Sequence, residues 1–334
     1  MGLPKRLLAV VVLAGACTGG APDRDSLEPI TESVDGTVAA TTTVDGTGPP
    51  TASTTTISVA ERLPALPTDI GGAVRADDGT ARPITGTDGE VWFIRGACGA
   101  DAVAPATTAA LIGPRHVVLD PGAGGADRGI ELGGLVEAEL NLDIAERTAA
   151  LLRAQGVTVA LTRTRDTDLS AGVRGALGPA LGARALVSIN VGVPVGAAAG
   201  PRPAVFHQIG DEQSRRLAGL VHEELVAAFA RFDGPWAALA EPGVRPLLNQ
   251  RGDDFFVVLD AGVGTPAVRV EVVAVGENEA TLLSTEEGRE AEAEALADAL
   301  VRFLVTDEQG DGFITPTETV RTAATSNTPG GCGG

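Results

Sequence analysis

Three polar residues with catalytic potential stand where predicted strands end. Asp120 closes a short apolar run and precedes the glycine-rich turn P-G-A-G-G, Asn190 closes the run A-L-V-S-I, and Glu271 follows P-A-V-R-V. Carboxylates in such positions act as general bases or metal ligands. Because the carboxyl ends of parallel strands meet at one edge of a sheet, we expect these three side chains to gather there.

Imidazole, a common metal ligand and general base, is scarce in this chain. Only His116, His207 and His222 are present, which constrains any multi-histidine metal site. His116 begins the strand that ends at Asp120, about 13 Å away along it. His207 lies in a neighbouring strand and could approach Asn190, whereas His222 is expected on a helix surface. The simplest interpretation of each is a solvent-facing or hydrogen-bonded structural side chain.

Residues 307–318, D-E-Q-G-D-G-F-I-T-P-T-E, resemble a calcium-binding EF-hand loop. Asp307, Asp311 and Glu318 occupy loop positions that supply carboxylates, and a glycine at the sixth position permits the sharp turn. Glutamine replaces the usual acidic third ligand, and little helix-forming sequence follows. A calcium site at these three residues therefore competes with a simpler interpretation, an acidic turn after the last helix.

The first residues are typical of a targeting signal. Residues 1–16 combine a basic start, a short apolar run and small residues, as in a cleaved export signal. The apolar run is too short to span a bilayer as a permanent helix. The sequence L-A-G-A-C resembles a bacterial lipobox, which implies that Cys17 becomes a lipidated first residue; plain secretion is the alternative.

Residues 17–60 are rich in Thr, Ala, Ser, Pro and Gly and predict a disordered tether. The chain carries 25 Lys and Arg against 44 Asp and Glu, a formal net charge of −19. Such a surface argues against nucleic-acid binding and is repelled by anionic lipid headgroups. Any membrane attachment is therefore expected through a lipid anchor alone.

The other two cysteines form an even pair. If Cys17 is lipidated, Cys98 and Cys332 are left in an exported, oxidising setting, where disulfides persist. We predict that they are bonded, and the alternative is two free thiols. Their wide separation and the absence of a C-x-x-C pair argue against a zinc site.

The remaining sequence predicts a small β-rich module over 61–113, an α/β domain over 114–306, and an acidic turn with a flexible tail over 307–334. In the module, residues 71–98 show short alternating runs that predict two or three strands packed on the domain that follows. In the domain, strands alternate with amphipathic segments such as 138–154. This alternation predicts the α/β class, with a mostly parallel central sheet covered by helices on both faces.

A series of motifs runs in order along the domain: V-V-L-D-P-G-A-G-G-A-D-R-G, G-L-V-E-A-E-L-N-L-D-I-A, V-A-L-T-R-T-R-D, L-S-A-G-V-R, L-V-S-I-N and T-P-A-V-R-V-E. Together they resemble the catalytic domain of the zinc-dependent N-acetylmuramoyl-L-alanine amidases. These enzymes cleave the bond between the glycan and the stem peptide of peptidoglycan. The resemblance implies the amidase fold, a cell-wall setting, and peptidoglycan or a cell-wall enzyme as the partner.

The resemblance also assigns a site. Members of the family hold zinc with a histidine in the glycine-rich turn, a glutamate opening the first helix and a histidine after a later strand; these positions are Ala123, Glu137 and Asn190 here. The glutamate that activates the zinc-bound water corresponds to Glu271. Two imidazoles are missing, so Glu137 is expected to be a vestigial ligand and Glu271 a vestigial general base, with no zinc cofactor. Other family positions still match: Asp127, Gly129, Arg163, Asp166 and Arg174.

Three functions remain open from the sequence. The first is an exported amidase-like protein without catalytic activity that binds peptidoglycan or a cell-wall enzyme. The second is an active amidase in peptidoglycan turnover that uses atypical metal ligands, with His207 or a partner protein completing the site. The third is a structural envelope protein with no glycan contact. Binding to sacculi separates the first from the third, and release of stem peptides separates the second from both.

Overall fold

The structure is a computed structural model that describes residues 58–192, 203–232, 243–274 and 282–314. All of them belong to one unit, residues 57–334. The predicted signal, most of the predicted tether and much of the tail lie outside the described residues, and so do Cys17, Glu318 and Cys332.

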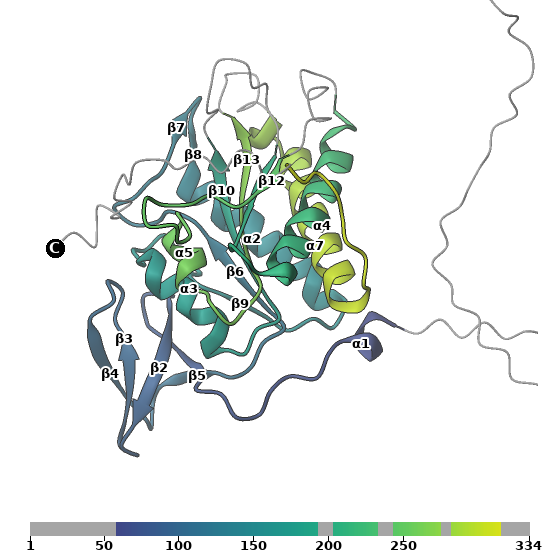
Figure 1. Cartoon of the computed structure of the whole chain (residues 1–334). Helices are drawn as coiled ribbons and strands as arrows, with labels where there is room; N and C mark the ends of the chain where they lie inside the picture. Colours follow the sequence, from purple (N-terminus) through teal and green to yellow (C-terminus); the bar gives the residue numbers. More distant parts are fainter. Residues whose placement is uncertain (1–57, 193–202, 233–242, 275–281, 315–334) are drawn as a thin grey trace, which may run out of the picture. The chain divides into compact units, whose positions relative to one another are not determined.

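A six-stranded sheet forms the centre of the fold (Figure 1), and its strand order is β12-β11-β13-β10-β6-β9. Its strands are β6 (Val117–Pro121), β9 (Val159–Leu161), β10 (Ala185–Gly192), β11 (Ala204–His207), β12 (Val244–Arg245) and β13 (Ala267–Ala274). The four strands β13, β10, β6 and β9 are parallel neighbours. β11 runs antiparallel to β13 and β12 runs parallel to β11. The predicted mostly parallel α/β sheet is therefore confirmed, with one reversed pair of strands at an edge.

Three long helices cover one face of the sheet: α2 (Glu137–Ala154), α4 (Glu212–Phe229) and α7 (Glu286–Val305). α2 buries residues spaced three or four apart, including Leu140, Ile144 and Leu152, against the strands. Helix α4 begins where Asp211 Oδ1 accepts a hydrogen bond from Ser214 N at 2.6 Å. The amphipathic segment predicted at 138–154 therefore forms the expected helix.

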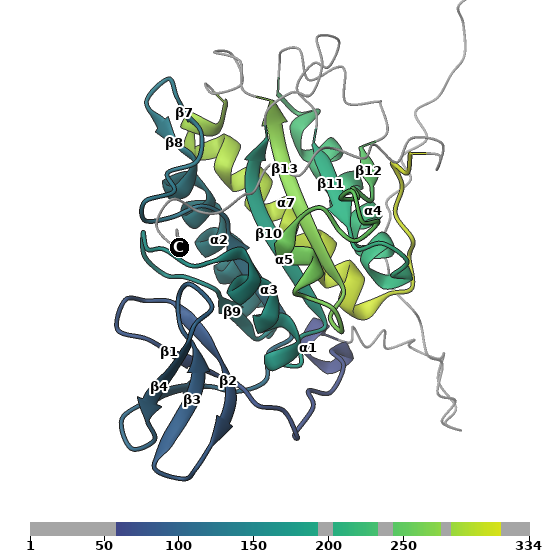
Figure 2. The same ribbon diagram turned by 60° about the vertical axis from the view of Figure 1, so that its left-hand side comes forward.

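The other face is covered by two shorter helices, and the β-rich module lies next to them beside β9 (Figure 2). The helices are α3 (Ala171–Ala180) and α5 (Val257–Asp260). The module is an antiparallel sheet, β4-β3-β2-β1-β5, built from β1 (Ala73–Arg75), β2 (Ala81–Thr87), β3 (Val91–Arg95), β4 (Asp101–Pro105) and β5 (Ala110–Ile112). Ala73, Ala81 and Ile112 share a core with α3 and with the central sheet. The two or three strands predicted within residues 71–98 are therefore confirmed as β1, β2 and β3, and β4 and β5, which follow that range, extend the sheet.

Two shorter elements complete the described fold. Helix α1 (Val59–Arg62) precedes the module, and a hairpin of β7 (Glu131–Leu132) and β8 (Leu135–Val136) leads into α2. Cys98 lies between β3 and β4 and is disulfide-bonded. Because Cys332 lies outside the described residues, the Cys98–Cys332 pairing stays a prediction. In the part of the chain that the structure describes, no helix combines the length and apolar character needed to cross a membrane.

Candidate functional site

Asn190 and Glu271 lie side by side on neighbouring strands. β10 and β13 are parallel, and their register pairs these two residues. Asn190 is buried, and its Nδ2 donates to Ser188 Oγ at 3.0 Å. The amide of Asn190 also packs on the glycine-rich turn, residues 121–126, so closely that a Cβ on Gly122 would overlap Asn190 Oδ1. The turn, Asn190 and Glu271 thus meet at one corner of the sheet.

Glu137 opens α2 and reaches the same corner. Its Oε1 accepts a hydrogen bond from Val191 N at 3.1 Å, and its Oε2 accepts one from Ile130 N at 2.9 Å. The residue is 8% exposed. Burial raises the pKa of Glu137, while the two backbone N–H groups and the positive charge of Arg269 offset part of that rise. The carboxylate therefore connects the hairpin before α2 to the end of β10.

The backbone of the glycine-rich turn is fixed by neighbouring side chains. Asp166 Oδ1 accepts a hydrogen bond from Gly125 N at 2.8 Å, and Arg174 Nη2 donates to Ala123 O at 2.7 Å. Ala123 has a φ of 55° and is the one non-glycine residue with positive φ in the described ranges. An L-residue pays a conformational penalty in this region, so the turn is held in place by its contacts.

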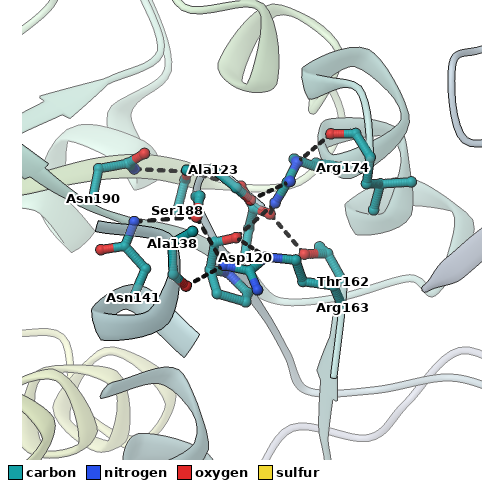
Figure 3. A network of polar contacts seen from close by, with 12 residues as sticks. Asp120, Ala123, Ala138, Asn141, Thr162, Arg163, Arg174, Ser188 and Asn190 are labelled. Atoms are coloured by element: carbon teal, nitrogen blue, oxygen red, sulfur yellow. Dashed lines mark hydrogen bonds and ion pairs between the residues drawn. The ribbon is translucent and has the colours of Figure 1, made fainter. Parts of the chain in front are cut away.

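Asp120 is the centre of a buried polar network beneath the turn (Figure 3). Arg174 Nη1 lies 2.9 Å from Asp120 Oδ1, Thr162 Oγ1 donates to the same oxygen at 2.6 Å, and Ser188 Oγ donates to Oδ2 at 2.8 Å. Burial alone would raise the pKa of Asp120, but the charge of Arg174 and these hydrogen bonds outweigh it and hold the pKa below its usual value. Ser188 links this network to Asn190.

Arg163 is fully buried beside the same network. Its guanidinium donates to four backbone carbonyl oxygens, those of Pro121, Gly122, Ala138 and Arg165. Burial, with the nearby charge of Arg174, lowers the pKa of Arg163 to about 10, so the group stays charged at neutral pH. Arg163 therefore joins the turn to α2, which is a structural role.

Glu271 forms an ion pair with Arg269, two residues earlier on β13. Arg269 Nε lies 2.9 Å from Glu271 Oε1, and the two side chains are 19% and 20% exposed. Residues two apart on a strand face the same side, so the sequence R-V-E contained a signal for this pair. The Arg269 guanidinium carbon also lies 4.6 Å from the centre of the Phe256 ring. The predicted general base is thus engaged in an ion pair.

Residues 117–302, more than half of the chain, match the family model described as N-acetylmuramoyl-L-alanine amidase. The chain belongs to the N-acetylmuramoyl-L-alanine amidase family. The match begins at β6 and ends within α7, so it covers the central sheet and its helices. The glycine-rich turn and the residues that meet at its corner all lie inside this amidase-family domain.

Individual relatives differ in how much of the amidase-family chain they cover. The uncharacterized protein YqiI of Bacillus subtilis is 29% identical over 213 residues, which are 63% of this chain and 96% of YqiI. The N-acetylmuramoyl-L-alanine amidase AmiC of Neisseria meningitidis is 45% identical over 75 residues, or 22% of this chain and 18% of AmiC.

Solved structures of amidases are also similar to this chain. The amidase AmiC2 of Nostoc punctiforme aligns with a TM-score of 0.47 at 27% identity, covering 56% of this chain and 96% of AmiC2. The N-acetylmuramoyl-L-alanine amidase of Clostridium difficile 630 aligns with a TM-score of 0.49 at 24% identity, covering 58% of this chain and 98% of that protein.

The amidase family is generally zinc-dependent, but the residues at this corner do not fit a catalytic zinc. Ala123 has no donor atom, and Asn190 offers an amide that is already packed on Gly122 and bonded to Ser188. Catalytic zinc takes three protein ligands, usually including imidazoles. Among the described residues, no group of three or more His, Cys, Asp or Glu side chains is arranged to hold a metal. We therefore assign no metal-assisted step to this site.

His207 does not reach the site in this amidase-family fold. β11 is antiparallel to β13, and its register pairs His207 with Val268. Val268 precedes Glu271 by three residues, about 10 Å along the strand toward the opposite edge of the sheet. His207 Nδ1 lies 2.9 Å from Gln208 O, and burial lowers the pKa of the imidazole. The antiparallel direction of β11 is what separates His207 from Asn190.

The other two histidines are structural. His116 Nε2 lies 3.1 Å from Pro64 O, at the start of β6. His222 was expected on a helix surface, and that expectation was wrong, because the residue is only 4% exposed. The C-terminal segment, residues 306–314, covers this part of α4, and a Cβ on its Gly312 would overlap the His222 imidazole. His222 Nδ1 lies 3.5 Å from Asp311 Oδ1.

The proposed calcium loop begins in the C-terminal segment. The segment runs over α4 and pairs with β12, where Val244 N donates to Gly312 O at 2.9 Å and Ile314 N donates to Val244 O at 3.0 Å. Asp307 and Asp311 belong to the segment, whereas Glu318 lies outside the described residues. A calcium site at these three residues therefore stays a prediction.

Proposed function

We propose that this protein is an exported, lipid-anchored member of the amidase family that binds peptidoglycan or a cell-wall enzyme and does not hydrolyse peptidoglycan. Family membership over residues 117–302 supports the cell-wall setting. The signal-like residues 1–16 and the lipobox-like sequence ending at Cys17 support export and anchoring.

The proposed lack of hydrolytic activity rests on the residue types that occupy the metal-binding positions of the family. Hydrolysis by this family needs a metal that polarises the carbonyl and lowers the pKa of bound water. The two positions that would supply imidazoles carry Ala123 and Asn190, and the position of the general base, Glu271, is ion-paired with Arg269. A base without metal-activated water contributes only about 10²–10⁴-fold on its own.

The proposed binding role rests on the residues that hold the glycine-rich turn in place. Asp166, Arg163 and Arg174 still fix the glycine-rich turn by hydrogen bonds to its backbone. A turn held in this way presents a preformed surface, which lowers the entropic cost of binding. Glu271 lies at this corner with a partly exposed side chain, and the buried carboxylate of Glu137 holds the end of β10 beside it.

Pull-down on purified sacculi tests the binding role. We expect the parent protein to sediment with sacculi at physiological salt, and Glu137→Ala and Glu271→Ala each to weaken this about ten-fold, the loss typical of a charged hydrogen bond. Glu139→Ala is the matched control, because Glu139 lies on the same helix with an exposed side chain. Absence of binding by the parent protein would favour a structural envelope protein.

Zinc analysis beside a muropeptide digest tests the inactivity. We expect no stoichiometric zinc in the purified protein and no release of stem peptides. Stoichiometric zinc, together with release that a chelator abolishes, would establish an active amidase with atypical ligands. For the anchor, Cys17→Ala is expected to move the protein from the membrane fraction to the medium, whereas an unchanged distribution would contradict lipidation.

A further inference from the structure

Two carboxylates, those of Glu137 and Glu271, lie at the corner of the sheet. Glu271 is the register partner of Asn190, and Glu137 accepts a hydrogen bond from the next residue, Val191. Both carboxylates therefore flank the end of β10. Two negative charges at one site repel each other, and a nearby cation stabilises both.

The two arginines beneath the turn, Arg163 and Arg174, bind groups other than Glu137 and Glu271. Arg174 is paired with Asp120 and also donates to the carbonyl oxygens of Leu169, Pro121 and Ala123. Arg163 donates all of its hydrogen bonds with described residues to backbone carbonyls. Neither guanidinium forms an ion pair with Glu137 or Glu271 among the residues that the structure describes.

Arg269 is placed differently. It lies two residues before Glu271 on β13, opposite Ser188 of β10, so its side chain leaves the sheet on the same face as those of Glu271 and Asn190. Its Nε contacts Glu271 Oε1 at 2.9 Å, and the Phe256 ring supports the guanidinium at 4.6 Å. Its charge also acts on Glu137, since it is one of the influences that favour the ionised form of that carboxylate.

We propose that Arg269 supplies the positive charge that balances Glu137 and Glu271, and that its guanidinium disfavours binding of a divalent metal at this site. This effect adds to the absence of the two histidines. A guanidinium is permanently charged and less strongly hydrated than an ammonium group, so it suits a half-buried carboxylate site. A metal ion at the same corner meets the positive charge of Arg269 and competes with it for Glu271. This inference rests on the proposed absence of zinc from the natural protein.

Zinc titration of three variants tests the inference, with zinc chloride as the probe and calorimetry as the readout. The first variant carries Ala123→His and Asn190→His, and the second adds Arg269→Leu. We expect the second to bind zinc at least about ten-fold more tightly, because a repelling charge has been removed and Glu271 released. The third variant, Arg95→Leu in place of Arg269→Leu, is the control for loss of an arginine, since Arg95 pairs with an exposed Asp101 in the β-rich module.

Equal zinc affinity of the first two variants would overturn the role of Arg269, whereas stoichiometric zinc in the unmodified protein would overturn the proposed function itself. The two failures are therefore distinguishable. If the histidine variants do not fold, a double-mutant cycle of Arg269→Leu and Glu271→Gln replaces them. We expect the fall in urea midpoint caused by Arg269→Leu to shrink by at least about half once Glu271 is neutral. An undiminished fall would contradict the proposal.

Discussion

Arg174 and Asp120 form a buried ion pair directly beneath the glycine-rich turn, with Arg174 Nη1 2.9 Å from Asp120 Oδ1. The two side chains are 7% and 1% exposed. Their charges compensate each other, and hydrogen bonds from Thr162 and Ser188 satisfy the carboxylate further. The pair is therefore well formed, and removing one partner leaves an uncompensated buried charge.

Arg174→Leu is accordingly expected to lower the free energy of unfolding by about 3–5 kcal/mol. Arg95→Leu, which breaks the exposed Arg95–Asp101 pair of the module, is expected to cost no more than about 1 kcal/mol. Urea denaturation of the purified variants measures both. Adding Asp120→Asn to Arg174→Leu should recover part of the loss, because the unpaired charge is then gone. Similar costs for Arg174→Leu and Arg95→Leu would show that the buried pair does not stabilise the turn.

The conformation of Ala123 leads to a second prediction. Its φ of 55° is costly for alanine but not for glycine, so Ala123→Gly is expected to raise the free energy of unfolding by about 0.5–1 kcal/mol. Ala126→Gly, in the same turn and without positive φ, is the control and is expected to destabilise the protein by a similar amount. Urea midpoints compare the two. A loss of stability in both variants would mean that the turn does not strain Ala123.

The sequence predicted those features that depend on local pattern. The apolar spacing of Leu140, Ile144 and Leu152 predicted α2 to within a residue of its observed start, and the apolar runs before Asp120 and Asn190 predicted buried strands. The grouping of Asn190 and Glu271 followed from the rule that the ends of parallel strands share an edge.

Features that depend on tertiary contacts were missed. The direction of β11 follows from how the chain returns to the sheet, which periodicity does not encode, and this direction places His207 at the wrong edge. His222 has the pattern of a helix-surface residue until the C-terminal segment covers it. Arg269 was passed over inside an apolar strand, although its spacing from Glu271 predicted a shared face.

The covering of His222 by the C-terminal segment gives a third prediction. Gly312 has a φ of 79°, and a Cβ there would overlap the imidazole, whereas Gly252 has a φ of 91° with open space around it. Gly252→Ala is therefore expected to cost about 1 kcal/mol from the backbone alone, and Gly312→Ala several-fold more, or to detach the segment. Hydrogen exchange at Ile314 N, which donates to Val244 O, reports detachment. Equal effects of the two substitutions would mean that the segment does not pack on His222 as described.

Glu292 of α7 is a carboxyl group buried in the core, and it gives the fourth prediction. The residue is 1% exposed, its Oε2 has no hydrogen-bond partner among the described residues, and burial raises its pKa to about 8. In the unfolded chain the same group titrates near 4.5. Between these two values the folded protein retains a proton that the unfolded chain has released. The contribution of protonated Glu292 to the free energy of unfolding is therefore fully present below about pH 4.5. It is lost progressively as the pH rises to about 8.

Glu292→Gln keeps the shape of the side chain and removes its titration, so the pH dependence due to Glu292 should disappear. We expect the variant and the parent protein to differ little at pH 5, and the variant to be more stable by a few kcal/mol, about 1.4 kcal/mol for each pH unit crossed, at pH 8. Asp254, whose pKa burial raises to about 6, contributes a similar trend in both proteins, so the difference between the two curves isolates Glu292. Glu294→Gln, an exposed position on the same helix, is the control and should parallel the parent protein. Urea midpoints measured from pH 5 to pH 8.5 decide the matter: parallel curves for the parent and Glu292→Gln would show that the buried carboxyl does not hold its proton in the folded state.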